Sequence, residues 1–354
     1  MNTEPAGNAS LVELRSLLPE QLAQLMQQLG EPAFRAKQIF SWCAKGVASI
    51  DEMSNLSKPL RETLKRRCLL TAPVILRRQQ SKKDGTIKYL FGLHDGNAVE
   101  SVLMRYEHGT SLCISSQVGC RMGCSFCAST IGGLVRNLSS GELLDQVLFA
   151  AKDSGQRIDS IVLMGIGEPF DNYDNVIQFF KLVNHKDGVN LGLRHISVST
   201  CGLVPGIDRL ALEGMPVTLS ISLHAPNNSL RSAMMPVNRQ YPIELLLAAA
   251  RRYAKSTGRK VYIEYTMISG KNDSPEHAKE LGALLRGMLC HVNLIPLNSV
   301  EGKSGVSSDR AAIDCFAQVL NGYGVTSTVR RKLGDDIDAA CGQLRRSNMK
   351  EQLS

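Results

Sequence analysis

The sequence predicts an α/β fold, in which a partial (βα)6 TIM-like barrel follows a small N-terminal helical domain and a β-hairpin extension. One observation leads to the prediction of a barrel. From about residue 111, short segments rich in Val, Ile and Leu alternate with amphipathic helical segments. Such repeated strand–helix units form parallel strands with right-handed crossovers. In these folds ligands bind at the C-terminal ends of the strands.

The individual elements follow from periodicity, turns and caps. Leu at helical spacing predicts a helix within residues 10–30, and further helices are expected within residues 31–46, after a Gly-Glu-Pro break, and within residues 57–70. An Asp-Gly turn and a Gly turn between residues 86 and 116 predict antiparallel strands. Barrel strands are expected within residues 111–118, 160–167, 195–201, 217–225, 261–268, 291–298 and 325–331, with helices within 140–154, 242–258, 274–288 and 309–324. Ser139 with Glu142 forms a possible capping box, and Ser274 precedes a Pro-Glu helix start.

These elements divide the chain into three expected parts. Residues 1–75 would form the N-terminal helical accessory domain, residues 76–110 the hairpin connection, and residues 111–354 the barrel with its C-terminal segment. A length of 354 residues suits one large α/β domain with a smaller companion.

Composition narrows the class of protein. Lys and Arg outnumber Asp and Glu by 41 to 33, which is compatible with a phosphate-rich partner. We find no signal-peptide pattern and no apolar run of membrane-spanning length. Ten cysteines in such a chain indicate a reducing cytoplasm and argue against a disulfide framework. We therefore expect a cytoplasmic protein in which clustered cysteines bind metal or take part in catalysis.

The segment CRMGCSFC places Cys120, Cys124 and Cys127 at C-x3-C-x2-C spacing, just after the first expected barrel strand. Three thiolates can hold three irons of a cubane cluster and leave the fourth iron for a small molecule. A structural zinc site normally has four ligands in paired C-x2-C knuckles, and here the fourth cysteine, Cys113, lies within the strand. The spacing favours iron–sulfur, with zinc as the alternative.

Several further motifs follow predicted strands. They are MGIGEP at 164–169, SVSTCG at 197–202, SLHAPN at 222–227 and LIPLN at 294–298, and the C-terminal segment contains GDDIDAACGQLR at 334–345. Each is weak alone, because a Gly-Glu-Pro turn or a Ser at a strand end is also ordinary loop chemistry. Their shared position after successive strands is the informative feature.

Together with the cysteine motif, these segments resemble the RlmN/Cfr family of radical S-adenosylmethionine (SAM) RNA adenine methyltransferases, over nearly the whole chain. The resemblance is greater to the RlmN branch, which methylates carbon 2 of an adenine in 23S rRNA and of adenine 37 in tRNAs. Cfr methylates carbon 8 at the same ribosomal adenine and gives antibiotic resistance. Carbon 8 therefore remains the alternative site of methylation. The resemblance also implies that residues 1–75 contribute to RNA binding.

The resemblance implies the cofactors and their ligands. Cys120, Cys124 and Cys127 would hold a 4Fe–4S cluster whose open iron binds SAM. One electron from the cluster cleaves SAM to a 5′-deoxyadenosyl radical in this superfamily. The remaining SAM contacts would be Gly167, Glu168, Ser199, Ser222, Leu223, His224 and Asn298.

The resemblance assigns catalysis to two cysteines and one carboxylate. Cys341 would be methylated by one SAM and, as an S-methylcysteine intermediate, would join covalently to the RNA base after a second SAM supplies the radical. Cys113 would then attack the Cys341 sulfur and release the methylated base, leaving a transient disulfide. Glu100 would accept the proton, although Cys113 is an alternative acceptor. On the sequence alone, Glu100 could equally be a surface acid on a two-sided ribbon.

The expected partners are 23S rRNA and tRNA, together with an electron donor such as flavodoxin or ferredoxin. We expect a monomer with no membrane association. The alternative from a different class is a zinc-stabilised, non-catalytic RNA-binding protein. The remaining cysteines, Cys43, Cys68, Cys201, Cys290 and Cys315, are expected to be core residues.

Overall fold

A ten-stranded sheet organises the molecule in the computed structural model, which describes residues 11–298, 305–331 and 333–337. The strand order is β14-β13-β12-β11-β10-β9-β6-β5-β4-β3. The parallel strands are β6 (Gly109–Cys113), β9 (Ser160–Leu163), β10 (Ile196–Thr200), β11 (Thr218–Ser222), β12 (Val261–Met267), β13 (Cys290–Pro296) and β14 (Ser327–Val329). The expected run of parallel strands is confirmed.

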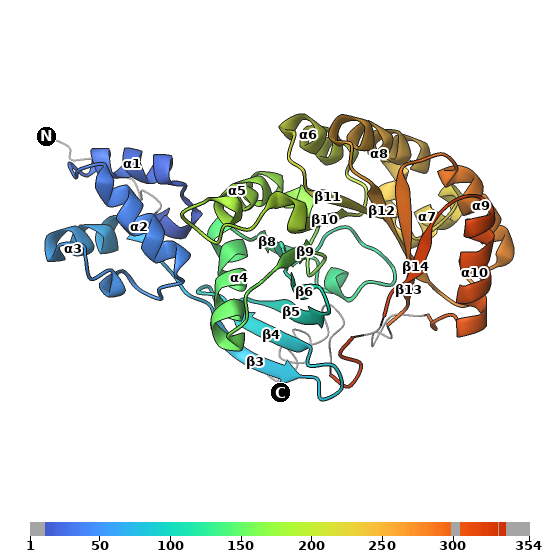
Figure 1. Ribbon diagram of the computed structural model, residues 1–354, viewed down its shortest axis with the longest axis horizontal. Coiled ribbons are helices and arrows are strands. Elements are labelled where there is room, and N and C mark those ends of the chain that lie inside the picture. The colour runs from blue at the N-terminus through green and yellow to red at the C-terminus, as the bar shows by residue number, and fades with distance from the viewer. Residues whose placement is uncertain (1–10, 299–304, 332, 338–354) are drawn as a thin grey trace, which may run out of the picture.

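Helices connect successive parallel strands and cover the outer face of the curved sheet (Figure 1). They are α4 (Ser140–Ser154), α5 (Tyr173–Asn184), α6 (Val204–Glu213), α7 (Asn228–Met234), α8 (Ile243–Thr257), α9 (Pro275–Leu285) and α10 (Arg310–Gly322). The capping box at α4 is present, since Ser139 Oγ accepts from the Glu142 amide and the Glu142 carboxylate accepts from the Ser139 amide. Within the described residues, the sheet runs from edge strand β14 to edge strand β3. The partial barrel is therefore confirmed.

The predicted hairpin extension is continuous with the barrel sheet. Strands β3 (Val74–Gln80), β4 (Ile87–Gly92) and β5 (Ala98–Tyr106) pair antiparallel and join the barrel through β5–β6 pairing. One face of β4 and β5 packs into the main core beneath α4, where Ser101 donates a hydrogen bond to Gln146 at 2.9 Å. The opposite face of β4 and β5 is directed away from this helix.

The N-terminal helices are α1 (Pro19–Gln28), α2 (Phe34–Ala44) and α3 (Lys58–Arg67), and they extend to one side of the barrel (Figure 1). Helices are confirmed within the expected ranges 10–30, 31–46 and 57–70, but residues 12–13 and 68–69, also expected to be helical, form strands. Strand β1 (Val12–Glu13) instead pairs in parallel with β2 (Cys68–Leu69), because each segment satisfies the other's backbone groups. Periodicity alone could not reveal this long-range pairing.

A buried ion pair joins the N-terminal region to the barrel. The Arg15 guanidinium donates to Asp145 on α4 and to the carbonyl oxygen of Val47, and both charged side chains are almost fully buried. Burial raises the pKa of the Asp145 carboxyl to about 7, although Arg15 opposes this shift. Removing either partner would leave the other charge uncompensated, so this pair fixes how the two regions meet.

Cys315 on α10 is exposed, so its expected place in the core is wrong, whereas Cys43, Cys68, Cys201 and Cys290 are buried as expected. No helix in the described ranges is long and apolar enough to cross a membrane.

Candidate active site

A short hairpin carries the three-cysteine motif. Strands β7 (Gln117–Gly119) and β8 (Leu134–Asn137) pair antiparallel and close the loop that holds the cysteines. Gly119 adopts a φ of +81°, and a Cβ there would lie 2.0 Å from the Gly133 carbonyl oxygen. A side chain is thus excluded where the loop closes. Cys120 and Cys124 are buried and Cys127 is half-buried.

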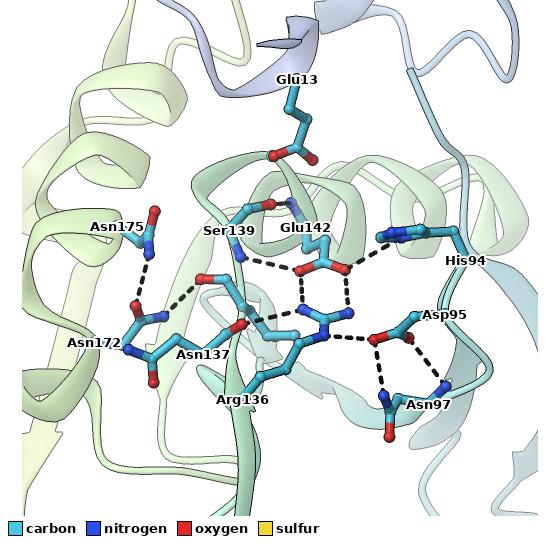
Figure 2. A network of polar contacts seen from close by, with 12 residues as sticks. Glu13, His94, Asp95, Asn97, Arg136, Asn137, Ser139, Glu142, Asn172 and Asn175 are labelled. Atoms are coloured by element: carbon cyan, nitrogen blue, oxygen red, sulfur yellow. Dashed lines mark hydrogen bonds and ion pairs between the residues drawn. The ribbon is translucent and has the colours of Figure 1, made fainter. Parts of the chain in front are cut away.

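Figure 2 shows how this hairpin is attached to its surroundings. Arg136 on β8 makes a bidentate contact with Glu142 at 2.7 and 2.8 Å, and its Nε donates to Asp95 at 2.6 Å. Asp95 lies in the β4–β5 turn and Glu142 in the first turn of α4. A planar guanidinium held by two carboxylates is geometrically restrictive. It therefore fixes the cysteine hairpin relative to the strand that carries Glu100.

The C-terminal ends of the parallel strands surround a cavity of about 290 Å³. Its lining includes all three motif cysteines and most of the residues predicted to contact SAM: Cys120, Cys124, Cys127, Gly167, Glu168, Ser199, Ser222, His224 and Asn298. The structure therefore brings together side chains up to 178 positions apart in the chain, between 120 and 298. Leu223 is the exception: its side chain is fully buried in the main core.

Glu168 is a buried carboxylate at the cavity wall. Its two oxygens accept hydrogen bonds from the amides of Phe170 at 3.1 Å and Cys201 at 2.7 Å. Burial raises the pKa of this carboxyl, and the Cys201 amide partly offsets the effect. The preceding residue, Gly167, has a φ of +114°, and a Cβ there would lie 2.6 Å from Ser116 Oγ. This close approach requires glycine beside the carboxylate.

His224 presents a neutral imidazole to the cavity. Its Nδ1 accepts from the Thr266 amide at 2.9 Å, so the proton is on Nε2. Burial lowers the pKa of His224 to about 3. Its ring packs edge-on against Phe126 from the cysteine loop, with centroids 5.0 Å apart. Nearby, Ser199 Oγ and Ser222 Oγ lie 3.3 Å apart on neighbouring strands.

A buried arginine that the sequence did not predict lies behind this wall. Arg231 on α7 is fully buried and donates to the carbonyl oxygens of Cys201 at 2.6 Å, Ser222 at 3.3 Å and Leu223 at 3.2 Å. It therefore ties together the ends of β10 and β11. Arg231 thus binds the carbonyl oxygen of Cys201, and the backbone N–H of the same residue donates to Glu168. An arginine seven residues beyond the SLH segment carries no sequence signal that distinguishes it from a surface residue.

The second group of predicted catalytic residues lies on the face of β5 and β6 opposite the α4 core. Cys113 pairs with Val102 in the strand register, and Glu100 lies two residues before Val102, so the thiol and carboxylate are diagonal neighbours on one face. Both are buried. Lys88 on β4 approaches the carboxylate to 3.0 Å and is itself fully buried. The surface-acid interpretation of Glu100 is thus wrong.

One residue connects the two groups. Met164, at the end of β9, packs with Cys113, Val102 and Met104, and it also lines the cysteine cavity. The thiol–carboxylate face therefore borders the cavity rather than lining it. Cys341, the predicted methyl carrier, lies outside the described residues.

The thiols of the cysteine motif lie in a buried setting. Burial raises the pKa of Cys120 and Cys124 to about 12. A bound cation would favour their thiolate forms.

A partial parallel barrel with this cysteine loop and this ring of strand-end residues defines a radical SAM enzyme. Residues 114–281 match the model of the radical SAM superfamily, and residues 12–70 match that of the ribosomal RNA large subunit methyltransferase N-terminal domain. The chain is 52% identical to the "Probable dual-specificity RNA methyltransferase RlmN" of Desulforamulus reducens, over 96% of this chain and 97% of that protein. A protein of the same name from Alkaliphilus oremlandii is 51% identical, over 96% and 98%.

Among solved structures, the chain resembles a radical SAM methyltransferase from Sphaerobacter thermophilus, with a TM-score of 0.89 and 46% identity over 94% of this chain and 98% of that one. The chain belongs to the RlmN family of radical SAM methyltransferases. This finding excludes the zinc-stabilised, non-catalytic protein as an alternative.

Proposed function

We propose that the protein methylates carbon 2 of an adenine in 23S rRNA and of adenine 37 in tRNAs, using two SAM molecules per turnover. The observation that carries this proposal is the position of the buried Cys113–Glu100 face at the border of the cysteine cavity. The names of the full-length relatives support RNA as the substrate of this chain. The excess of Lys and Arg is consistent with that partner.

The residues around the cavity fit both cofactors. Cys120, Cys124 and Cys127 would hold a 4Fe–4S cluster, and Glu168 can accept hydrogen bonds from an ammonium group. Ser199, Ser222, His224 and Asn298 would contact the rest of SAM from the strand ends, with Leu223 contributing through its backbone. When bound, the cluster and SAM would supply the one-electron chemistry that makes hydrogen abstraction possible.

The chain's own side chains would perform the remaining steps. Cys341 would carry the methyl group and become joined to the base. Glu100, held by Lys88, would take the proton from the adduct. The Cys113 thiolate would then attack the Cys341 sulfur, releasing the methylated base and leaving a disulfide that a reductant must open. Because Cys113 and Glu100 lie on one strand face, both can reach the same adduct.

The wider setting of the enzyme follows from the same proposal. We place residues 1–75 as the RNA-binding accessory domain, 76–110 as the connecting strands and 111–354 as the catalytic domain. The protein would act as a monomer in the cytoplasm and receive electrons from flavodoxin or ferredoxin.

Mass spectrometry of nucleosides tests the proposal. Cluster-loaded protein, SAM and a reductant would be incubated with unmodified 23S rRNA and tRNA, and the digested adenosines analysed. We expect 2-methyladenosine from both RNAs. Formation of 8-methyladenosine would show that the enzyme methylates carbon 8, as Cfr does, and not carbon 2. The absence of any methyladenosine would contradict the proposed function.

A further inference from the structure

A buried carboxylate in the middle of the barrel has no place in the proposed steps. Glu264 on β12 faces the barrel interior and is 3% exposed. Its Oε1 accepts from Asn293 Nδ2 at 2.9 Å. Its Oε2 has no hydrogen-bond donor among the described residues, and the nearest cation, Arg330 Nη1, is 4.0 Å away. This separation is too long for a hydrogen bond.

An acceptor buried without a donor costs free energy and calls for a physical explanation. Burial raises the pKa of the Glu264 carboxyl, and Arg330, Asn293 and the nearby Ser220 hydroxyl only partly offset the effect. Glu264 lines the cysteine cavity, so a ligand bound there would lie beside this carboxylate. A ligand with an N–H or O–H donor would satisfy it.

A second cavity indicates the chemical class of a ligand that could reach Glu264. It measures about 930 Å³ and lies where the parallel strands begin, at the opposite end of the barrel from the cysteine loop. It shares Met164, Glu264 and Arg330 with the cysteine cavity, so the two meet at the level of Glu264. Its exposed lining includes Arg105, Arg194 and Arg331. A basic entrance of this kind suits a phosphate-bearing chain.

We propose that Glu264 is a specificity-determining residue that accepts a hydrogen bond from the exocyclic amino group of the target adenine, which reaches it through this second cavity. The proposal rests on the proposed function. A purine with a carbonyl oxygen in place of the amino group would direct an acceptor at the carboxylate. Such a base would be rejected, because two acceptors would face each other without a proton between them.

The test compares target bases and protein variants in RNA binding. The probe is an RNA stem-loop that carries the proposed target site, with either adenine or purine at the target position; purine lacks the amino group. Binding to cluster-loaded full-length protein is measured by fluorescence anisotropy. We expect wild type to bind the adenine RNA about tenfold more tightly. In Glu264→Leu the two RNAs should bind with about equal affinity, because the hydrogen-bond acceptor is gone.

Matched variants separate recognition from stability. Glu213→Leu removes an exposed acid at the end of α6 and should leave the tenfold preference unchanged. Glu264→Gln keeps the shape of the side chain and confirms, by its unfolding temperature, that the barrel tolerates loss of this charge. SAM affinity of each variant is measured by equilibrium dialysis and should stay within about twofold of wild type.

The outcomes are distinct. If Glu264→Leu loses SAM affinity and keeps the preference for adenine, the carboxylate serves SAM and the proposal is overturned. A wild type that methylates adenine but binds both RNAs equally also overturns it, while the proposed function stands. A wild type that shows the preference and methylates nothing supports the recognition role and contradicts the proposed function instead.

Discussion

The cysteine cavity and the Cys113–Glu100 face are built in opposite ways. The cavity is assembled from loops at the C-terminal ends of parallel strands, and backbone amides, glycines and a buried arginine hold its polar groups. The thiol–carboxylate face lies on antiparallel strands, and the buried Lys88 ammonium compensates the Glu100 carboxylate there. The comparison shows that the cavity holds its polar groups largely through backbone contacts, whereas the second face holds its carboxylate through a buried ion pair between side chains.

The largest expected effect is on the cavity side, in the Cys120→Ala variant. With only two thiolates remaining in the loop, the protein should lose its cluster and its methyltransferase activity should fall below detection. Iron and sulfide analysis of anaerobically reconstituted protein measures this loss directly. Cys315→Ala is the matched control, because this thiol is exposed on α10. Retention of a full cluster by Cys120→Ala would contradict the ligand assignment.

On the other face, Lys88→Met should destabilise the protein by about 3–5 kcal/mol, because it leaves the buried Glu100 carboxylate without its cation. Urea unfolding measures the change. The double variant Lys88→Met/Glu100→Gln should recover part of the loss, since the charge that needed compensation is gone. Lys83→Met removes an exposed lysine paired with Asp335 and should have little effect. Equal losses of stability in Lys88→Met and Lys83→Met would contradict the expectation that the buried ion pair contributes more to stability than the exposed one.

A smaller effect is expected behind the cavity wall. Arg231→Met should weaken SAM binding by about tenfold, because the backbone of Cys201, whose N–H donates to Glu168, loses the contact that holds its carbonyl oxygen. Arg231→Lys keeps the charge but cannot reproduce the planar fork, so its affinity should be intermediate. Equilibrium dialysis with cluster-loaded protein measures both. The control variant Arg209→Met changes an exposed arginine and should bind SAM normally. Normal SAM binding by Arg231→Met would show that Arg231 only fills space.

The smallest effect concerns pH. The pKa of His224 falls from 6.5 to about 3 on folding, so the unfolded chain binds the extra proton first as pH decreases. Its contribution to stability is fully present above about pH 6.5 and is lost progressively as pH falls toward 3. Urea midpoints measured between pH 7 and pH 5 should therefore decrease. The decrease should be smaller in His224→Gln, and an identical slope would show that His224 is not the group responsible.

The same comparison explains what the sequence could predict. The cavity was predictable because parallel strands bring their C-terminal ends to one edge, so motifs such as Gly167-Glu168 and Ser199 could be placed together from their positions after strands. The Glu100 face was predictable in part, from an acid that alternates with Val102 and Met104 on a strand.

The missed features depend on contacts between distant segments. Lys88 reads as an ordinary polar residue in its strand, and its partnership with Glu100 depends on burial of both side chains. Arg231 and Glu264 carry no local signal, because their roles arise from carbonyl oxygens and cavities contributed by other strands. The pairing of β1 with β2 likewise joins residues more than fifty positions apart.

The central claim is that the two regions act on one base, and the Cys113→Ala variant tests it most directly. Without its resolving thiol, the adduct between RNA and Cys341 should accumulate during incubation with SAM, reductant and substrate RNA. Mass spectrometry of the digested complex measures this adduct. We predict an adenosine linked to Cys341 through one carbon in Cys113→Ala and far less of it in wild type. An active wild type whose Cys113→Ala variant traps no RNA would contradict the account.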